Sequence, residues 1–141
     1  MKKTIILFIS LFSFMVYSQQ ADYSSYFKTG TKFNVNDLDR FMDQVFIGKT
    51  DAIKQTIRYE VYRDLLANRM AVALLPSDKV STIQSTNDVV LINELNPELT
   101  YDKGFDPQTF NPFKYNLNFS PQSSVAYRIG SSDYVIIIIS E

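Results

Sequence analysis

The 141-residue chain contains no cysteine, no histidine and no tryptophan. Without cysteine it can form no disulfide, and it has neither a thiolate nucleophile nor a cysteine for lipid attachment. Without histidine it has no Ser-His or Cys-His catalytic pair and no imidazole metal ligand. Only four glycines are present, all of them isolated, so the chain also lacks a glycine-rich phosphate-binding loop. These absences exclude most common enzyme mechanisms and leave carboxylates as the main candidates for catalysis.

The first 18 residues have the pattern of a signal peptide. Lys2 and Lys3 precede a mostly apolar segment at residues 4–16, and polar residues follow from position 17. An apolar segment of this length is typical of a signal peptide and is too short to span a membrane, which needs roughly 20 residues. Val16 and Ser18 are small enough to direct cleavage after Ser18. We therefore expect an exported mature chain, residues 19–141, with no stable membrane span.

The cleavage junction and the charge balance indicate where the mature chain goes. A Ser-Gln junction after a Phe-rich apolar segment resembles the signal peptides of Gram-negative bacteria, which implies a periplasmic or extracellular protein. Since Lys2 and Lys3 fall in the leader, the mature chain carries 12 basic and 15 acidic residues. A weakly acidic chain without a basic run is a poor match for nucleic acid or anionic membranes. Its length suits one domain, at residues 19–141.

Helical patterns dominate the first half of the mature chain. Apolar residues recur at helical spacing over residues 35–47, with Gly48 as a stop, and again over residues 51–69. Residues 70–75 are ambiguous, but their Ala and Leu content and the following Pro76 favour helix over strand. The preceding segment, residues 19–34, is expected to lie over the core through its aromatic side chains.

Strand patterns dominate the second half. Residues 89–92 predict a buried strand, and residues 114–119, 125–129 and 134–139 predict an antiparallel meander whose last hairpin turns at Gly130. The final run of β-branched residues is expected to be a central strand, because it would aggregate if exposed. The sequence thus predicts an α+β fold, with two N-terminal helices packed on one face of a small antiparallel sheet.

The carboxylates give only weak candidates for chemistry. Acidic residues cluster on the first helix and in two loops, but nothing in their spacing indicates a cleft of the kind that a hydrolase with paired carboxylates needs. Asp102 and Asp106 flank Gly104 and could ligate calcium through oxygen, although the spacing is not that of an EF-hand. An ordinary turn is the simpler interpretation. We therefore predict no catalytic residue, no metal site and no cofactor.

The loop at residues 101–115 is the best candidate for a binding surface, because it is rich in aromatic residues. Such side chains are typical of surfaces that bind proteins or glycans, but they also cover the second face of a small sheet. The predicted partner-binding residues are Tyr101, Phe105, Phe110 and Phe113. The sequence favours a non-enzymatic binding or accessory module of the bacterial envelope, whose partner is a protein or a glycan. The alternatives are a small carboxylate-dependent hydrolase and a structural subunit that assembles through a sheet edge.

Overall fold

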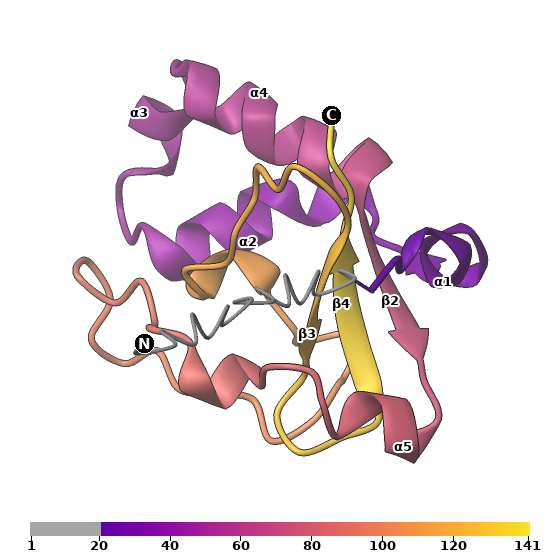
Figure 1. The fold of residues 1–141 in the computed structure, drawn as a ribbon. Coiled ribbons are helices and arrows are strands. Elements are labelled where there is room, and N and C mark those ends of the chain that lie inside the picture. The colour runs from indigo at the N-terminus through magenta and orange to yellow at the C-terminus, as the bar shows by residue number, and fades with distance from the viewer. Residues whose placement is uncertain (1–20) are drawn as a thin grey trace, which may run out of the picture.

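The computed structural model describes residues 21–141, and the predicted signal peptide at residues 1–18 lies outside them. Four strands form one antiparallel sheet in the order β1-β2-β4-β3, with helices around it (Figure 1). The strands are β1 (Thr31–Lys32), β2 (Met70–Leu74), β3 (Val125–Arg128) and β4 (Tyr134–Ile138). The predicted α+β class with an antiparallel sheet is therefore confirmed.

The last strand, β4, has the central position that its unbroken apolar sequence predicts. It pairs with β2 along its whole length, from Tyr134 opposite Leu74 to Ile138 opposite Met70, and with β3 on its other side. The β3–β4 hairpin turns at Gly130, whose φ of 57° lies in the left-handed region that glycine adopts without steric cost. This hairpin, too, forms as predicted.

One face of the sheet carries the larger core. Side chains from alternate positions of β2 and β4 point into it, as expected for strands with a period of two. The 3-10 turn η1 (Val35–Asp37) leads directly into helix α2 (Leu38–Val45), which confirms most of the helix predicted at residues 35–47. The residues that α2 contributes to this core follow the i, i+3, i+4, i+7 pattern, and they are Leu38, Phe41, Met42 and Val45.

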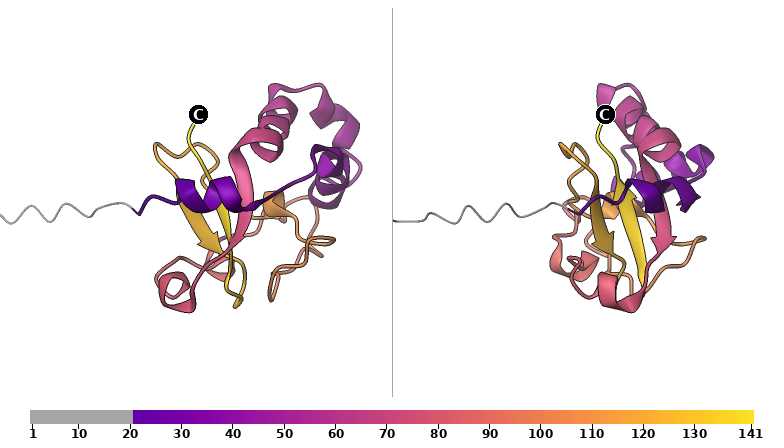
Figure 2. Two further views of the ribbon diagram at one scale, coloured as in Figure 1. Left: turned by 90° about the vertical axis from the view of Figure 1, so that its right-hand side faces the viewer. Right: turned by 45° about the vertical axis from the view of Figure 1, so that its right-hand side comes forward.

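The opposite face of the sheet is covered by α1 (Ser24–Thr29) and α5 (Ser77–Val80). Val135 and Ile137 of β4 point to this side, where Val80 and the half-buried Tyr26 and Phe27 pack against them. Figure 2 shows α1 lying across the sheet on this face. The helices predicted at residues 35–47 and 51–69 both contribute to the larger core, whereas the cover of the second face by α1 and α5 was not predicted. The expectation that the lead-in segment lies over the core through its aromatics is confirmed.

The segment after the second helix is a strand, which corrects the prediction of a helix at residues 70–75. Met70 and Val72 face one core while Ala71 and Ala73 face the other, so both sides of β2 are buried. Five consecutive residues of β2 pair with β4. This ladder decides the conformation, because the helix preference of Ala and Leu amounts to only a few tenths of a kcal/mol per residue.

The helix predicted at residues 51–69 is divided into three pieces. They are α3 (Thr50–Lys54), α4 (Ile57–Asp64) and the π-helical turn η2 (Leu65–Arg69). The chain is extended at Thr56, with φ −109° and ψ 155°, so the backbone changes direction there. Because of this break, Ile57 leaves the apolar row that the sequence shows and is 81% exposed.

Two predicted strands, at residues 89–92 and 114–119, do not form. Their only sheet-like contact in the described part of the chain is one isolated bridge, between Leu91 and Tyr115. The third strand beside the hairpin is β2 instead, supplied from the first half of the chain. Apart from the short 3-10 turns η3 (Thr86–Asp88) and η4 (Pro112–Lys114), residues 81–124 follow an irregular path. None of the helices among residues 21–141 is long and apolar enough to cross a membrane.

Candidate functional site

The four predicted partner-binding residues have different environments. Phe110 and Phe113 are buried in the core, each with 1% of its surface exposed. Phe105 is half-buried, and Tyr101 is 45% exposed. The predicted exposed patch of four aromatic side chains is therefore not present, since two of the four cannot reach a partner in this fold.

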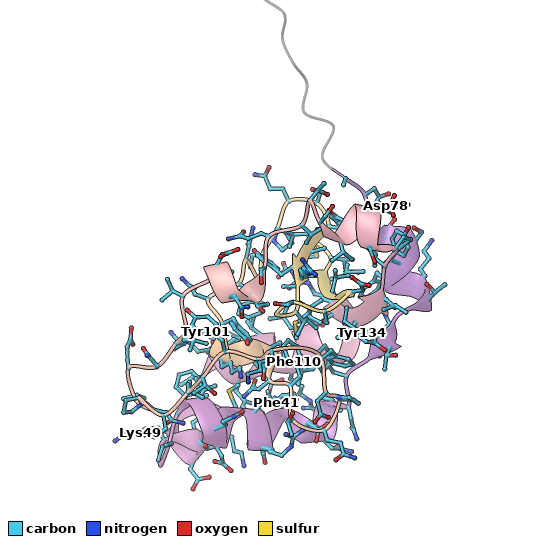
Figure 3. The ribbon with its side chains drawn as sticks, turned by 90° about the horizontal axis from the view of Figure 1, so that it is seen from below. Phe41, Lys49, Asp78, Tyr101, Phe110 and Tyr134 are labelled. Carbon is cyan, nitrogen blue, oxygen red and sulfur yellow. The ribbon has the colours of Figure 1, made fainter. Side chains whose placement is uncertain are left out.

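Three of the four residues nevertheless belong to one row of touching rings, which we call the aromatic row. It runs from Tyr101 to Tyr115, Phe110, Phe105 and Tyr134, with ring centroids 5.2 to 6.2 Å apart at each step. Figure 3 shows Phe110 between Tyr101 and Tyr134 when the molecule is viewed from below. Both ends of the row reach the surface while its middle is buried. The loop is thus pinned to the core by its aromatics and leaves one ring exposed at each end.

Phe113 belongs to a different cluster. Its ring lies 4.5 Å from that of Tyr62 on α4 and 5.6 Å from that of Phe119. It also contacts the ring of Phe41 on α2 at 6.2 Å. Phe113 therefore joins the irregular segment to the two helices, which is a structural role.

The Tyr134 end of the aromatic row leads to a cavity with a mixed apolar and polar lining. By the strand register, Thr31, Val72, Leu74 and Tyr134 share the face of the sheet that carries the larger core. At this end of the sheet the core stops, and Leu74 and Tyr134 are 62% and 37% exposed. A cavity of about 180 Å³ is reached from these residues through Val72, two positions before Leu74 on β2, and through Phe105, whose ring contacts that of Tyr134. Leu74 and Tyr134 do not line this cavity themselves; its other lining residues are Thr31, Lys32, Phe33, Asn34, Asp37, Phe41 and Pro107. We call this cavity, together with Leu74 and Tyr134, the Leu74 groove.

The sheet has an open edge at the same place. β1 pairs with β2 only at Val72 and Ala71, so the pairing on this edge stops before Leu74. The next residue, Leu75, donates its backbone N–H to Asp133 on the β4 side. Because backbone groups alternate in direction along a strand, those of Leu74 point to the open edge. An exposed apolar side chain and free strand backbone therefore coincide at one residue.

The acidic cluster on α2 does not have the properties of a catalytic acid. Asp39 accepts hydrogen bonds from Lys54 Nζ at 2.7 Å and from the Tyr59 hydroxyl at 2.6 Å. These bonds, with the charge of Lys54, hold the pKa of Asp39 below its ordinary value. Asp43 accepts a hydrogen bond from the Thr50 hydroxyl. A general acid needs a raised pKa, so Asp39 is better suited to remain a permanent anion.

The two carboxylates of the turn at residues 102–106 are engaged by protein groups. Asp102 accepts hydrogen bonds from Lys114 Nζ at 2.8 Å and from the Tyr115 hydroxyl at 2.7 Å. Asp106 Oδ1 accepts from the backbone N–H of Gln108. Both carboxylates therefore have protein partners, and among residues 21–141 no group of three metal-ligating side chains occurs.

Sequence reasoning missed the two residues that define the groove. Leu74 lies in a run of apolar residues that we expected to be helical, and Tyr134 begins a strand that we expected to be buried throughout. A correct assignment of β2 would have revealed Leu74, since its position places it on the same face as Val72 but nearer the strand end.

Comparison of the chain with protein-family models, with curated proteins and with solved structures gives no match.

Proposed function

We propose that the chain is an exported, non-enzymatic binding module of the bacterial cell envelope, and that the Leu74 groove binds an extended apolar segment of a partner protein. The signal-peptide pattern at residues 1–18 supports export. Asp39, the best-placed carboxylate of α2, is held as an anion by Lys54 and Tyr59 and is therefore not suited to act as a general acid. The observation that carries the proposal is the coincidence of exposed apolar side chains and an open strand edge at Leu74.

An extended peptide fits both features at once. A segment lying beside Leu74 can pair with its free N–H and C=O and continue the sheet on the edge that β1 leaves open. Alternate side chains of that segment would point into the cavity lined by Phe105 and Pro107. A helix would fill the cavity but could not use the strand edge, so an extended partner is the better match.

Most of the affinity must come from side chains, because Pro76 follows closely and limits the length of edge available for pairing. Covering an exposed side chain such as Leu74 or Tyr134 contributes roughly 1–2 kcal/mol. Two such residues near a preformed cavity can act as a binding hot spot, with weaker contacts around them.

The same open edge supports a second candidate function, in which the partner is another copy of this chain. Two edges that meet antiparallel at Leu74 would form a continuous sheet across a symmetric dimer. A self-associating structural subunit and a module for a foreign partner would use the same groove, so one experiment can distinguish them.

Replacing Leu74 by Asp is expected to abolish partner binding while leaving the fold intact, because the side chain is largely exposed and the new charge would be desolvated in the complex. A matched control is Val90→Asp, since Val90 is 70% exposed but does not line the groove. The measurement uses the full chain in its native host, with a photo-crosslinking residue at position 74 or 90, followed by mass spectrometry of the adduct. The wild-type mass in solution is determined by analytical ultracentrifugation.

A specific adduct at position 74, absent at position 90 and lost when Tyr134 is also changed to Asp, would support binding of the partner at the Leu74 groove. An adduct that contains only this chain, together with a wild-type dimer that Leu74→Asp dissociates, would identify the partner as a second copy. Equal adducts at positions 74 and 90, or no adduct at position 74, would contradict the proposal.

A further inference from the structure

A second cavity, separate from the Leu74 groove, lies between the start of α2 and helix α4. Its volume is about 310 Å³, at the lower end of the roughly 300–1,000 Å³ that is usual for small-ligand pockets. Figure 1 shows α2 and α4 on the same side of the sheet. The lining residues are Val35, Asn36, Leu38, Asp39, Tyr59 and Arg63. We call it the α2–α4 pocket.

Two of its polar side chains are held in place by other residues. The Asp39 carboxylate is fixed by Lys54 Nζ through one oxygen and by the Tyr59 hydroxyl through the other. The hydrogen bond to Asp39 also raises the pKa of Tyr59, so its hydroxyl stays protonated and continues to donate to the carboxylate. Each oxygen of the Asp39 carboxylate retains a further lone pair for an additional hydrogen bond. The pocket therefore presents preorganised acceptors.

Two other polar side chains have unused hydrogen-bonding capacity. Among residues 21–141 the guanidinium of Arg63 has a single, distant ion pair, 4.0 Å from Glu60, and more than half of its side chain is exposed. Within residues 21–141, the Asn36 side chain makes no hydrogen bond, although its backbone N–H is bound by Asn34. Arg63 supplies donors, and the Asn36 amide supplies both donors and an acceptor.

We propose that the α2–α4 pocket binds one neutral monosaccharide unit of a glycan. Neighbouring hydroxyls of a sugar both donate and accept, which matches the acceptor of Asp39 beside the donors of Arg63 and Asn36. The apolar C–H face of the sugar can lie against Val35 and the ring of Tyr59, which are both partly exposed. Opposite charges of Asp39 and Lys54, and of Arg63 and Glu60, nearly balance. The pocket thus favours an uncharged ligand over an anion or a cation.

This site shares no lining residue with the Leu74 groove, although η1 contributes to both: Val35 and Asn36 line the α2–α4 pocket and Asp37 lines the other cavity. None of its lining residues belongs to the aromatic row. The chain would then carry a glycan-binding surface on its helical side and a protein-binding groove at the end of its sheet. Loss of one activity should leave the other unchanged.

The test is a titration of the ¹⁵N-labelled mature chain with neutral oligosaccharides of glucose and of N-acetylglucosamine, followed by amide chemical shifts. We expect millimolar binding of at least one probe, with the largest shifts at the residues that line the pocket. Removing a hydrogen bond to a charged group should weaken binding by about tenfold or more, so Asp39→Asn and Arg63→Gln should each do so. The matched control is Arg40→Gln, since Arg40 is an exposed α2 residue paired with Asp37 and lies outside the pocket lining.

The amide spectrum of each variant reports directly whether it is folded, so a loss of binding can be separated from a loss of structure. Unchanged affinity in Asp39→Asn and Arg63→Gln, or shifts equally distributed over the surface, would overturn the proposal. So would the absence of any shift with either neutral probe at millimolar concentration.

Discussion

Replacing Gly130 by Ala is expected to lower the free energy of unfolding by about 3 kcal/mol, which corresponds to a fall in Tm of roughly 10 °C for a domain of this size. Two costs combine at this position. The φ of 57° is unfavourable for a residue with a Cβ atom. The added Cβ would also lie 2.5 Å from the Asp102 carbonyl oxygen and would clash with the backbone of Lys103. Neither neighbour is a flexible side chain that could move away.

The clash would have wider effects, because Gly130 connects the β3–β4 hairpin to the irregular segment at residues 85–86 by hydrogen bonds. Its N–H donates to the Thr86 hydroxyl at 3.0 Å, and its carbonyl accepts from the Ser85 hydroxyl at 2.9 Å. Displacing the turn would therefore disturb η3 and the loop at Asp102 together. Thermal and urea unfolding of the mature chain, monitored by circular dichroism, would measure the loss.

Gly48 provides the matched control for this prediction. It also has a positive φ, of 70°, but a Cβ added there would meet nothing within 4 Å. Gly48→Ala should therefore show the conformational cost alone, about 1 kcal/mol. If both variants lose the same stability, the close approach of Gly130 to Lys103 has no energetic importance.

The elements that the sequence predicts correctly are those whose signal is local. The β3–β4 hairpin is encoded by two apolar runs around Gly130, and α2 by the helical spacing of four apolar residues. The central place of β4 follows from its β-branched residues, which need cover on both faces. Each of these patterns can be recognised within about a dozen residues.

The elements that the sequence predicts wrongly depend on contacts between residues distant in sequence. β2 is a strand because β4, more than sixty residues later, pairs with it, as in Ala71 opposite Ile137. The apolar residues at 89–92 and 114–119 are packed without forming a continuous strand pairing. One contact between the two segments is the isolated Leu91–Tyr115 bridge. No local pattern distinguishes these arrangements from a helix or from regular strands.

The candidate site was predictable only in part, for the same reason. The aromatic composition of the 101–115 loop correctly indicated that it is pinned by its rings, but composition does not say which rings are inside. Phe110 is buried while Phe105 remains half-exposed because Phe110 stacks on Tyr115, and Phe105 packs at the edge against Tyr134. The unpaired backbone of Leu74 depends on where β1 stops, which only the register shows.

Replacing Lys114 by Met is expected to lower the free energy of unfolding by about 3–5 kcal/mol, the range for breaking a buried ion pair by removing one partner. Lys114 is 4% exposed, and its Nζ donates to the Asp102 carboxylate at 2.8 Å and to the Thr100 carbonyl at 2.7 Å. Loss of the ammonium would leave the largely buried carboxylate with Tyr115 as its remaining side-chain donor. That hydroxyl is a neutral donor and carries no positive charge in either protonation state; burial and its bond to Asp102 raise the pKa of Tyr115 and keep it protonated.

The pair between Lys54 and Asp39 offers a control of nearly identical geometry. Its nitrogen and oxygen are 2.7 Å apart, but both side chains are more than one-third exposed. Since solvent screens exposed pairs, Lys54→Met should lose far less stability than Lys114→Met. The double variant Lys114→Met with Asp102→Asn should be less damaging than the sum of its single changes, because no unpaired charge remains inside. Equal losses for Lys54→Met and Lys114→Met in urea unfolding would show that burial does not determine the strength of these pairs.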